Sequence, residues 1–283
     1  MFSFSFRTFS SLNPLFLSTK SKLWPNFKPM LIILGPAKTI DTSPHGITEG
    51  FSFPQYLDQA EKLVDQLRSC SISQLKSLMK VSDKLAILNF ERYAHWRSSY
   101  TADEGQHAIL AFSGEVFNGL QARSLNEADL LFAQGHVRLL SGLYGVLRPL
   151  DLILPYRLEM GTRMAPPGAK HLYEFWEKII PVHIAEETGK QEKKVLINLA
   201  SNEYFKSIQP GSFPYDIITP VFKESDGAGF RNVTVYAKKA RGMMLRYIIQ
   251  NRIRHPEYLQ AFDEDGYYFN NDLSTKKEWI FFR

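Results

Sequence analysis

Short apolar runs alternate with helix-type patterns along almost the whole chain after Met30. MLIIL (30–34) and KVLINLAS (194–201) are apolar runs bounded by turn residues, which is typical of buried strands. Residues 55–96 and 237–254 have apolar positions three and four apart, which predicts helices. No internal repeat or linker interrupts the alternation. The sequence therefore predicts an α/β (mixed α+β) fold, in a single compact domain around a central sheet with many helices.

Local patterns predict further elements between these segments. HAILAF (107–112) is an apolar run that predicts a strand, followed by a turn at Asn118-Gly119. The capping box SLNE begins a helix predicted over residues 124–140. NVTVYA (232–237) predicts another strand.

The first 29 residues differ in composition from the rest. They contain six Ser, six Phe and four basic residues, but no acid. An acid-poor, Ser-rich, basic segment is typical of an organelle transit peptide, and a disordered tail is the alternative. We therefore predict a leader over residues 1–29 and a folded domain over 30–283. The expected location is the matrix or stroma of a mitochondrion or chloroplast after the leader is removed, and cytoplasmic if the leader is not used.

Other features limit the kinds of ligand that the sequence predicts. One cysteine, Cys70, excludes an internal disulfide and a Cys-based metal site. The seven His residues are dispersed, so we expect no metal and no cofactor. No apolar run approaches the roughly 20 residues that span a bilayer, so we expect no membrane partner.

A basic segment without acids extends over residues 227–256. It contains Arg231, Lys238, Lys239, Arg241, Arg246, Arg252 and Arg254. Because the accompanying apolar residues surround nearly the whole predicted helix, the helix should be buried and its cations must find partners. They either form salt bridges within the domain or line a cleft that holds an anion. Helical spacing places Lys238, Arg241 and Arg252 on one side and Lys239 and Arg246 on another.

Polar residues also follow two predicted strands. Lys38 follows the first strand, and Ser201, Glu203 and Lys206 follow the strand at 194–201. The carboxyl ends of strands commonly carry the site residues of α/β proteins. The alternative for Ser201 is simple helix capping, which needs no function.

The stretch LLSGLYGVLRPLDLILPYRLEMG (139–161) carries charges within an apolar segment. Gly142 and Gly145 resemble the hairpin of a helix-hairpin-helix element, whose backbone N–H groups can contact a DNA phosphate. The remaining polar groups either pair inside the core or face a cleft. They are Tyr144, Arg148, Asp151, Arg157 and Glu159.

Several blocks of the chain resemble the bacterial YaaA peroxide-stress family. They are MLIILGPAKT, VSDKLA, QHAILAFSGEVFNGL, LSGLYGVLRPLDLILPYRLEMG, NLASNEYFKS and YAKKARGMMLRYII, which together span nearly all of residues 30–282. The resemblance implies a family-specific α/β fold with a basic cleft and a helix-hairpin-helix element. It also implies binding to duplex and branched DNA, a link to DNA repair and protection against hydrogen peroxide. One departure is Gly35, where the family usually has Ser.

Two main hypotheses follow from these observations. The first is a DNA-binding protein with weak sequence specificity that protects against oxidative stress. Its phosphate contacts would be Lys38, Gly142, Gly145, Arg148, Arg157, Lys206, Lys238, Lys239, Arg241 and Arg246. The alternative is an enzyme that acts on a nucleotide, nucleobase or other small anion, for which acid–base or orienting roles would fall to Tyr144, Asp151, Glu159, Ser201 and Glu203. Neither the catalysed reaction nor the oligomeric state follows from the sequence.

Overall fold

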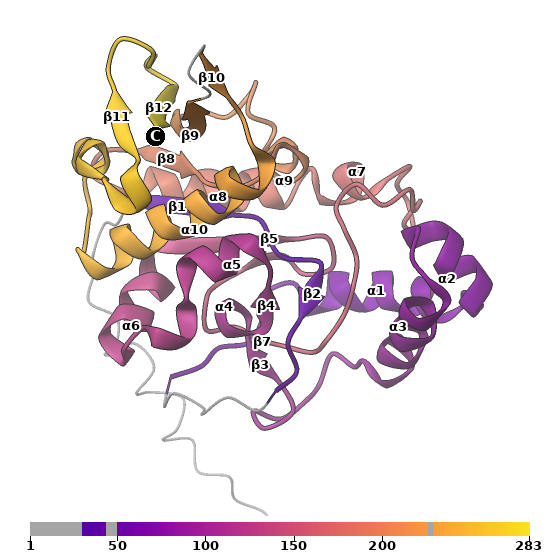
Figure 1. Ribbon diagram of the computed structural model, residues 1–283. Helices are drawn as coiled ribbons and strands as arrows, with labels where there is room; N and C mark the ends of the chain where they lie inside the picture. Colours follow the sequence, from indigo (N-terminus) through magenta and orange to yellow (C-terminus); the bar gives the residue numbers. More distant parts are fainter. Residues whose placement is uncertain (1–29, 44–49, 226–228) are drawn as a thin grey trace, which may run out of the picture.

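The computed structural model describes residues 30–43, 50–225 and 229–283. The predicted leader, residues 1–29, lies outside the described residues. Within them, the chain forms a mixed α/β domain built on an eight-stranded sheet (Figure 1). The predicted fold class is therefore confirmed.

The main sheet has the strand order β11-β12-β9-β8-β1-β5-β6, and β10 pairs with the end of β9. The inner strands β12, β9, β8, β1 and β5 run parallel, whereas β6, β10 and β11 pair antiparallel at the margins. Unbroken burial of β1 explains its continuous apolar run, and β5 is likewise buried throughout. The strands are β1 (Leu31–Leu34), β5 (Val137–Ser141), β6 (Gly145–Leu147), β8 (Val195–Asn198), β9 (Asp216–Ser225), β10 (Phe230–Arg231), β11 (Tyr268–Asn270) and β12 (Glu278–Phe282).

Two short ladders and the helices complete the fold. The ladders pair β2 (Thr39–Ile40) with β4 (Phe112–Ser113) and β3 (Gln106–His107) with β7 (Leu152–Ile153). The helices are α1 (Leu57–Arg68), α2 (Ile72–Met79), α3 (Asp83–His95), α4 (Ala108–Ala111), α5 (Glu115–Leu120), α6 (Glu127–His136), α7 (Leu172–Trp176), α8 (Ile180–Gly189), α9 (Asn202–Phe205) and α10 (Thr234–Gln250). Short 3₁₀ helices are η2 (Ala122–Ser124), η3 (Lys206–Ile208), η4 (Pro256–Ala261) and η5 (Glu264–Gly266). Figure 1 shows α1–α3 as a lobe at the right, while α5, α6 and α10 lie together at the left.

The helices of the lobe follow the predicted pattern. Residues 55–96 contain α1, α2 and α3, with breaks where serines begin the second and third helices. Ser71 forms a capping box with Gln74, and the Ser82 hydroxyl accepts a hydrogen bond from Leu85 N. Such caps satisfy the free N–H groups of a first helical turn. The helix starts are therefore encoded locally.

Four local predictions were wrong. HAILAF forms the short buried helix α4 between β3 and β4, because Ala108 N and Ile109 N donate to Asp151 O and Pro149 O instead of to a ladder. The 118–119 turn lies inside α5. The helix predicted over 124–140 begins at Glu127 after an Asn126 cap and ends at His136, where β5 begins. NVTVYA is mostly the first turn of α10, and only Phe230–Arg231 forms a strand nearby.

Two glycines let α5 and α10 touch at their backbones. A Cβ added to Gly119 would lie 2.0 Å from Lys239 O, and one added to Gly242 would lie 1.8 Å from Val116 O. Side chains would separate the two helices at both places. Gly119 therefore serves the close packing of α5 on α10, and not the hairpin turn that an Asn-Gly pair usually indicates.

The Gly142–Gly145 segment is not part of a helix-hairpin-helix element. It is the turn of a β-hairpin between β5 and β6, and it is buried. The hydroxyl of Ser141 accepts hydrogen bonds from Leu143 N and Tyr144 N, at 3.2 and 2.9 Å. The N–H groups of Leu143 and Tyr144 are therefore used inside the protein. Gly142 and Gly145 are themselves buried, so their predicted phosphate contacts are not supported. The glycines are required by packing, because added Cβ atoms would lie 2.3 Å from Leu158 O and 2.7 Å from the Trp176 ring.

Candidate functional site

The strand order reverses direction between β1 and β8. From β1 the chain next enters the main sheet at β5, on one side, whereas from β8 it proceeds to β9, on the other side. In open α/β sheets, ligands bind outside the carboxyl ends of strands at such a switch point. We call the residues gathered at this place the switch-point site: Lys38, Arg157, Glu159, Gly161, Ser201, Glu203 and Tyr204.

The carboxylate of Glu159 joins two cations in this site. Its Oε2 lies 2.9 Å from Lys38 Nζ, and its Oε1 accepts a hydrogen bond from Arg157 Nη2 at 2.7 Å. The Lys38 side chain is 66% exposed, whereas those of Arg157 and Glu159 are 15% and 23% exposed. Arg157 Nε is buried and has no hydrogen-bond partner among the described residues. Lys38 is thus an accessible cation, and the Nε donor of Arg157 is unused within the described residues.

A second carboxylate holds the chain that follows Glu159. Glu203 Oε1 accepts a hydrogen bond from Gly161 N at 2.8 Å, and Glu203 O accepts one from Tyr173 OH at 3.0 Å. Tyr204, the next residue in the chain, is buried. Burial raises the pKa of Tyr204 well above its usual range, and the nearby Tyr156 and Glu203 add to the increase. Tyr204 therefore keeps its proton at neutral pH.

Gly35 follows β1 at the floor of this site. A Cβ added there would lie 3.4 Å from the Tyr204 ring and 3.8 Å from Ser201 N, both ordinary contacts. The Cβ of the serine that is usual in the resembled family would therefore fit without displacing its neighbours. Ser201 itself precedes α9 as its N-cap, but its side chain makes no capping hydrogen bond. Its hydroxyl is not used for the simple capping role considered as the alternative.

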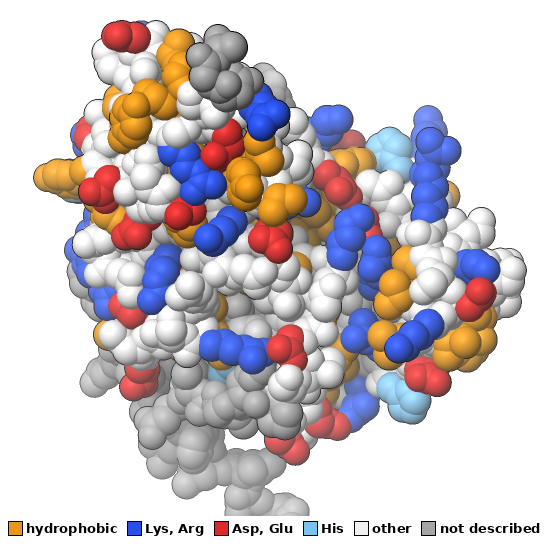
Figure 2. All heavy atoms as spheres, viewed as in Figure 1, with side chains coloured by type: hydrophobic (Ala, Val, Ile, Leu, Met, Phe, Trp, Pro, Cys, Tyr) orange, Lys and Arg blue, Asp and Glu red, His pale blue; other side chains and the backbone are white. Residues whose placement is uncertain are grey.

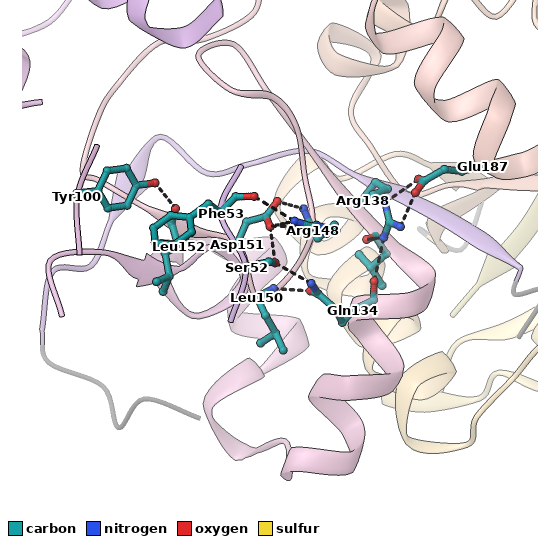
Figure 3. A network of polar contacts seen from close by, with 11 residues as sticks. Ser52, Phe53, Tyr100, Gln134, Arg138, Arg148, Leu150, Asp151, Leu152 and Glu187 are labelled. Atoms are coloured by element: carbon teal, nitrogen blue, oxygen red, sulfur yellow. Dashed lines mark hydrogen bonds and ion pairs between the residues drawn. The ribbon is translucent and has the colours of Figure 1, made fainter. Parts of the chain in front are cut away.

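Two of the predicted site residues, Arg148 and Asp151, belong instead to a buried network (Figure 3). Asp151 is 1% exposed and accepts hydrogen bonds from Ser52 Oγ, Arg148 N and Arg148 Nε. Gln134 continues the network by donating to Ser52 Oγ and accepting from Leu150 N. Arg148 also donates to Phe53 O at 3.0 Å. Asp151 and Arg148 therefore fix the chain around β7, and the Arg148 side chain stays 40% exposed.

Tyr144 has a structural position as well. It is fully buried, and its hydroxyl accepts hydrogen bonds from Trp96 Nε1 at 2.8 Å and Leu154 N at 3.2 Å. Burial raises the pKa of Tyr144 above its usual value, although the hydrogen bonds from Trp96 and Leu154 lower it in part. This hydroxyl is not placed to exchange protons with a ligand at the switch point.

Lys239 and Arg246 lie on one side of α10, as helical spacing predicts, whereas Arg252, which that spacing grouped with Lys238 and Arg241, lies beyond the helix and pairs with Asp129. Lys239 and Arg246 line a cavity of about 310 Å³ together with Glu264 and Asp265. Arg246 Nη1 donates to Leu120 O, Gln121 O and Ser124 Oγ, which satisfies the end of α5, and Lys239 Nζ lies 3.7 Å from Asp265. These two cations therefore stabilise the packing of α5, α10 and η5.

Lys238 and Arg241 differ from these residues. Neither forms an ion pair or a hydrogen bond with the described residues, and Arg241 is mostly buried. Burial lowers the pKa of the Arg241 guanidinium, and no nearby acid counters this effect among the residues that the structure describes. Lys206, just after α9, is exposed and likewise without a partner among the described residues. Figure 2 shows the wider surface, where Lys and Arg side chains (blue) are interspersed with Asp and Glu (red).

The described residues contain no group of three or more His, Cys, Asp or Glu side chains placed to hold a metal ion. None of the helices in residues 30–43, 50–225 and 229–283 combines the length and hydropathy that a bilayer-crossing helix needs.

Two members of the site were not predicted from the sequence. Tyr204 and Gly161 stand beside the predicted residues Glu203 and Glu159, but neither attracts attention as a residue type. The position of Tyr204, soon after a strand end, is the signal that could have identified it. Gly161 contributes only a backbone N–H, which no side-chain pattern reveals.

The fold and site define a mixed α/β protein with charged groups gathered at the carboxyl ends of its parallel strands. More particularly, the chain belongs to the peroxide stress protein YaaA family, whose model matches residues 30–273. The family name connects the chain with peroxide stress, as the resemblance implied.

Proposed function

We propose that this protein protects against peroxide stress by binding DNA through its sugar–phosphate backbone. The observation that carries the proposal is Arg241, a mostly buried guanidinium with no acid partner among the described residues. An uncompensated buried charge is costly, and a bound anion removes that cost. Lys238, one helical turn away, and the exposed Lys38 and Lys206 supply further cations. Such contacts give affinity without sequence preference.

The direct test compares two charge-reversal variants by mobility shift and anisotropy with a labelled duplex. Lys238→Glu/Arg241→Glu should weaken binding at least tenfold and reduce the salt slope by about 0.9 for each phosphate that the variant no longer neutralises. The matched control is Lys62→Glu/Lys84→Glu, which makes the same charge change on the exposed surface of α1 and α3. Equal binding by both folded variants, or an equal loss in both, would exclude the α10 cations as the contact.

The second candidate is an enzyme or binding protein for a nucleotide, nucleobase or other small anion. The switch-point site favours it, because Glu159 and Glu203 stand beside Arg157 and the buried hydroxyl of Tyr204. A DNA groove needs cations but has little use for two carboxylates. Calorimetric titration with nucleoside monophosphates tests this candidate. The candidate is supported if the wild type shows saturable binding, Arg157→Gln abolishes that binding and Lys238→Glu binds with unchanged affinity. The absence of binding heat with every nucleotide tested would count against it.

The location proposed for the protein is an organelle matrix or stroma. Its support is the composition of residues 1–29, which lie outside the described residues. Fluorescent fusions of the full chain and of residues 30–283 test it. Organelle fluorescence with the full chain alone is the expected result, and identical diffuse cytoplasmic patterns would refute it.

A further inference from the structure

Four side chains form a row across one face of the main sheet. Tyr268 on β11 pairs with Phe282 on β12, and Phe282 pairs with Lys223 on β9. Phe230 on β10 pairs with Ser225, two residues beyond Lys223 and hence on the same face. We call Tyr268, Phe282, Lys223 and Phe230 the aromatic row. Figure 1 shows its four strands together at the top of the molecule.

The rings of this row are in contact with one another and with solvent. The Phe282 ring centroid lies 4.1 Å from that of Tyr268 and 4.6 Å from that of Phe230. Tyr268 is 52% exposed and Phe230 is 43% exposed. Alternate residues of the same strands point to the opposite face, where Phe222 and Phe281 are buried. The hydrophobic core thus lies on the face that carries Phe222 and Phe281, and the rings of the aromatic row lie outside it.

The aromatic row contains one cation, Lys223. Lys223 lies beside Phe282 on this face, whereas the exposed Arg231 of β10 pairs with Glu224 and belongs to the opposite face. Two acids near these strands pair with Arg283, since Glu224 Oε2 lies 2.8 Å from Arg283 Nε and Asp265 Oδ2 lies 2.6 Å from Arg283 Nη1. A third, Glu278, is exposed at the start of β12, four residues from Phe282. Glu224 points to the other side of the sheet, because residue 224 alternates with 223.

We propose that the aromatic row binds unpaired bases of single-stranded nucleic acid. Exposed rings on adjacent strands of a sheet are a common platform for base stacking, and a lysine among them can contact the connecting phosphates. Strands lie about 4.8 Å apart, so successive rings can follow successive unstacked bases. A protein partner fits less well, because Lys is depleted from the centres of protein interfaces. The inference extends the proposed DNA binding to a second surface, but it does not depend on Lys238 or Arg241.

The experiment uses the full chain and a labelled oligothymidylate of about 12 nucleotides, within the roughly 4–16 that one such surface covers. The duplex of the same length is measured in parallel. Tyr268→Ala/Phe230→Ala should weaken single-strand binding by about tenfold or more, because stacking on aromatic rings supplies much of the affinity for unpaired bases. Duplex binding should be unchanged. Lys223→Gln should reduce the single-strand salt slope by about 0.7, as expected for one phosphate contact.

The matched control is Tyr258→Ala on η4, which removes a tyrosine that is 62% exposed and lies outside the row. Circular dichroism confirms that each variant is folded. The proposal is wrong if the wild type does not bind the single strand at low salt, or if the double variant binds it as tightly as the control. Sedimentation in which the wild type is a dimer and the double variant a monomer would also overturn it, since the row would then join two copies. The α10 variants test duplex binding and the aromatic-row variants test single-strand binding. Either proposal can therefore be refuted while the other stands.

Discussion

Glu159 forms an ion pair with Lys38 across the switch point, with Oε2 2.9 Å from Nζ. The same carboxylate holds Arg157, so one acid neutralises two cations that the site presents. Glu159 therefore supplies the negative charge between these two cations.

Glu159→Gln should strengthen binding to a DNA duplex. The amide keeps the shape of the side chain but removes the charge, which frees Lys38 and Arg157 for phosphates. We expect affinity to rise about threefold to tenfold and the salt slope to steepen by up to about 0.9 for each added phosphate contact. Anisotropy at several salt concentrations measures both quantities. Glu91→Gln, an exposed acid on α3, is the control, and an equal rise in both variants would show only a general charge effect.

Asp151→Asn should destabilise the protein without acting on any ligand. The change removes a buried charge that holds Arg148 and Ser52, and it leaves their donors poorly satisfied. A loss of about 2–4 kcal/mol in the free energy of unfolding is expected. Urea denaturation measures it, with the exposed Asp272→Asn as a neutral comparison. An unchanged midpoint would mean that the network in Figure 3 contributes little.

Two glycine substitutions should change stability in opposite directions. Gly119→Ala places a Cβ 2.0 Å from Lys239 O, so the helices must separate, at a cost of about 3 kcal/mol. Gly135→Ala in α6 meets nothing within 4 Å and should stabilise by roughly 0.5–1 kcal/mol, because alanine is the better helix former. Thermal unfolding of the pair measures the difference. Similar melting temperatures would contradict the backbone contact between α5 and α10.

His136 should make stability depend on pH below neutrality. Burial lowers the pKa of His136 from 6.5 to about 4, with a smaller contribution from the charges of Arg254, Arg138 and Arg252. The unfolded chain therefore binds the proton first, so this contribution is complete above pH 6.5 and is lost as the pH falls toward 4. The wild type should lose on the order of 2–3 kcal/mol more than His136→Asn over this range. Urea unfolding at about pH 7 and about pH 4.5 compares the two, and parallel curves would refute the assignment.

Long patterns predicted the fold because burial imposes them over many residues. The run at 31–34 and the helical period over 237–254 each reflect one consistently buried surface. A short run such as HAILAF fits both a buried strand and a buried helical turn. Its backbone partners, at Pro149 and Asp151, decided the outcome, and they are distant in sequence.

The candidate site was predictable only in part, because the contacts that decide the role of each residue come from segments distant in sequence. Strand ends indicated Lys38, Ser201 and Glu203, which the structure does bring to one place with Glu159. Residue type alone could not separate Arg241, which lacks an acid partner among the described residues, from Arg246, which satisfies the carbonyls at the end of α5. Their partners are set by how α10 packs on α5, and packing leaves no local signal.

The central position of β1 has a consequence for biosynthesis. Its two neighbours, β5 and β8, are translated much later, and β8 begins only at Val195. Until then the nascent chain carries an apolar strand whose pairing is incomplete, and parallel pairing of distant segments forms slowly. Such edges are prone to aggregate or to bind chaperones. Ribosome-bound chains that end before residue 195 should therefore be captured by chaperones, whereas chains extending beyond Phe282 should be released.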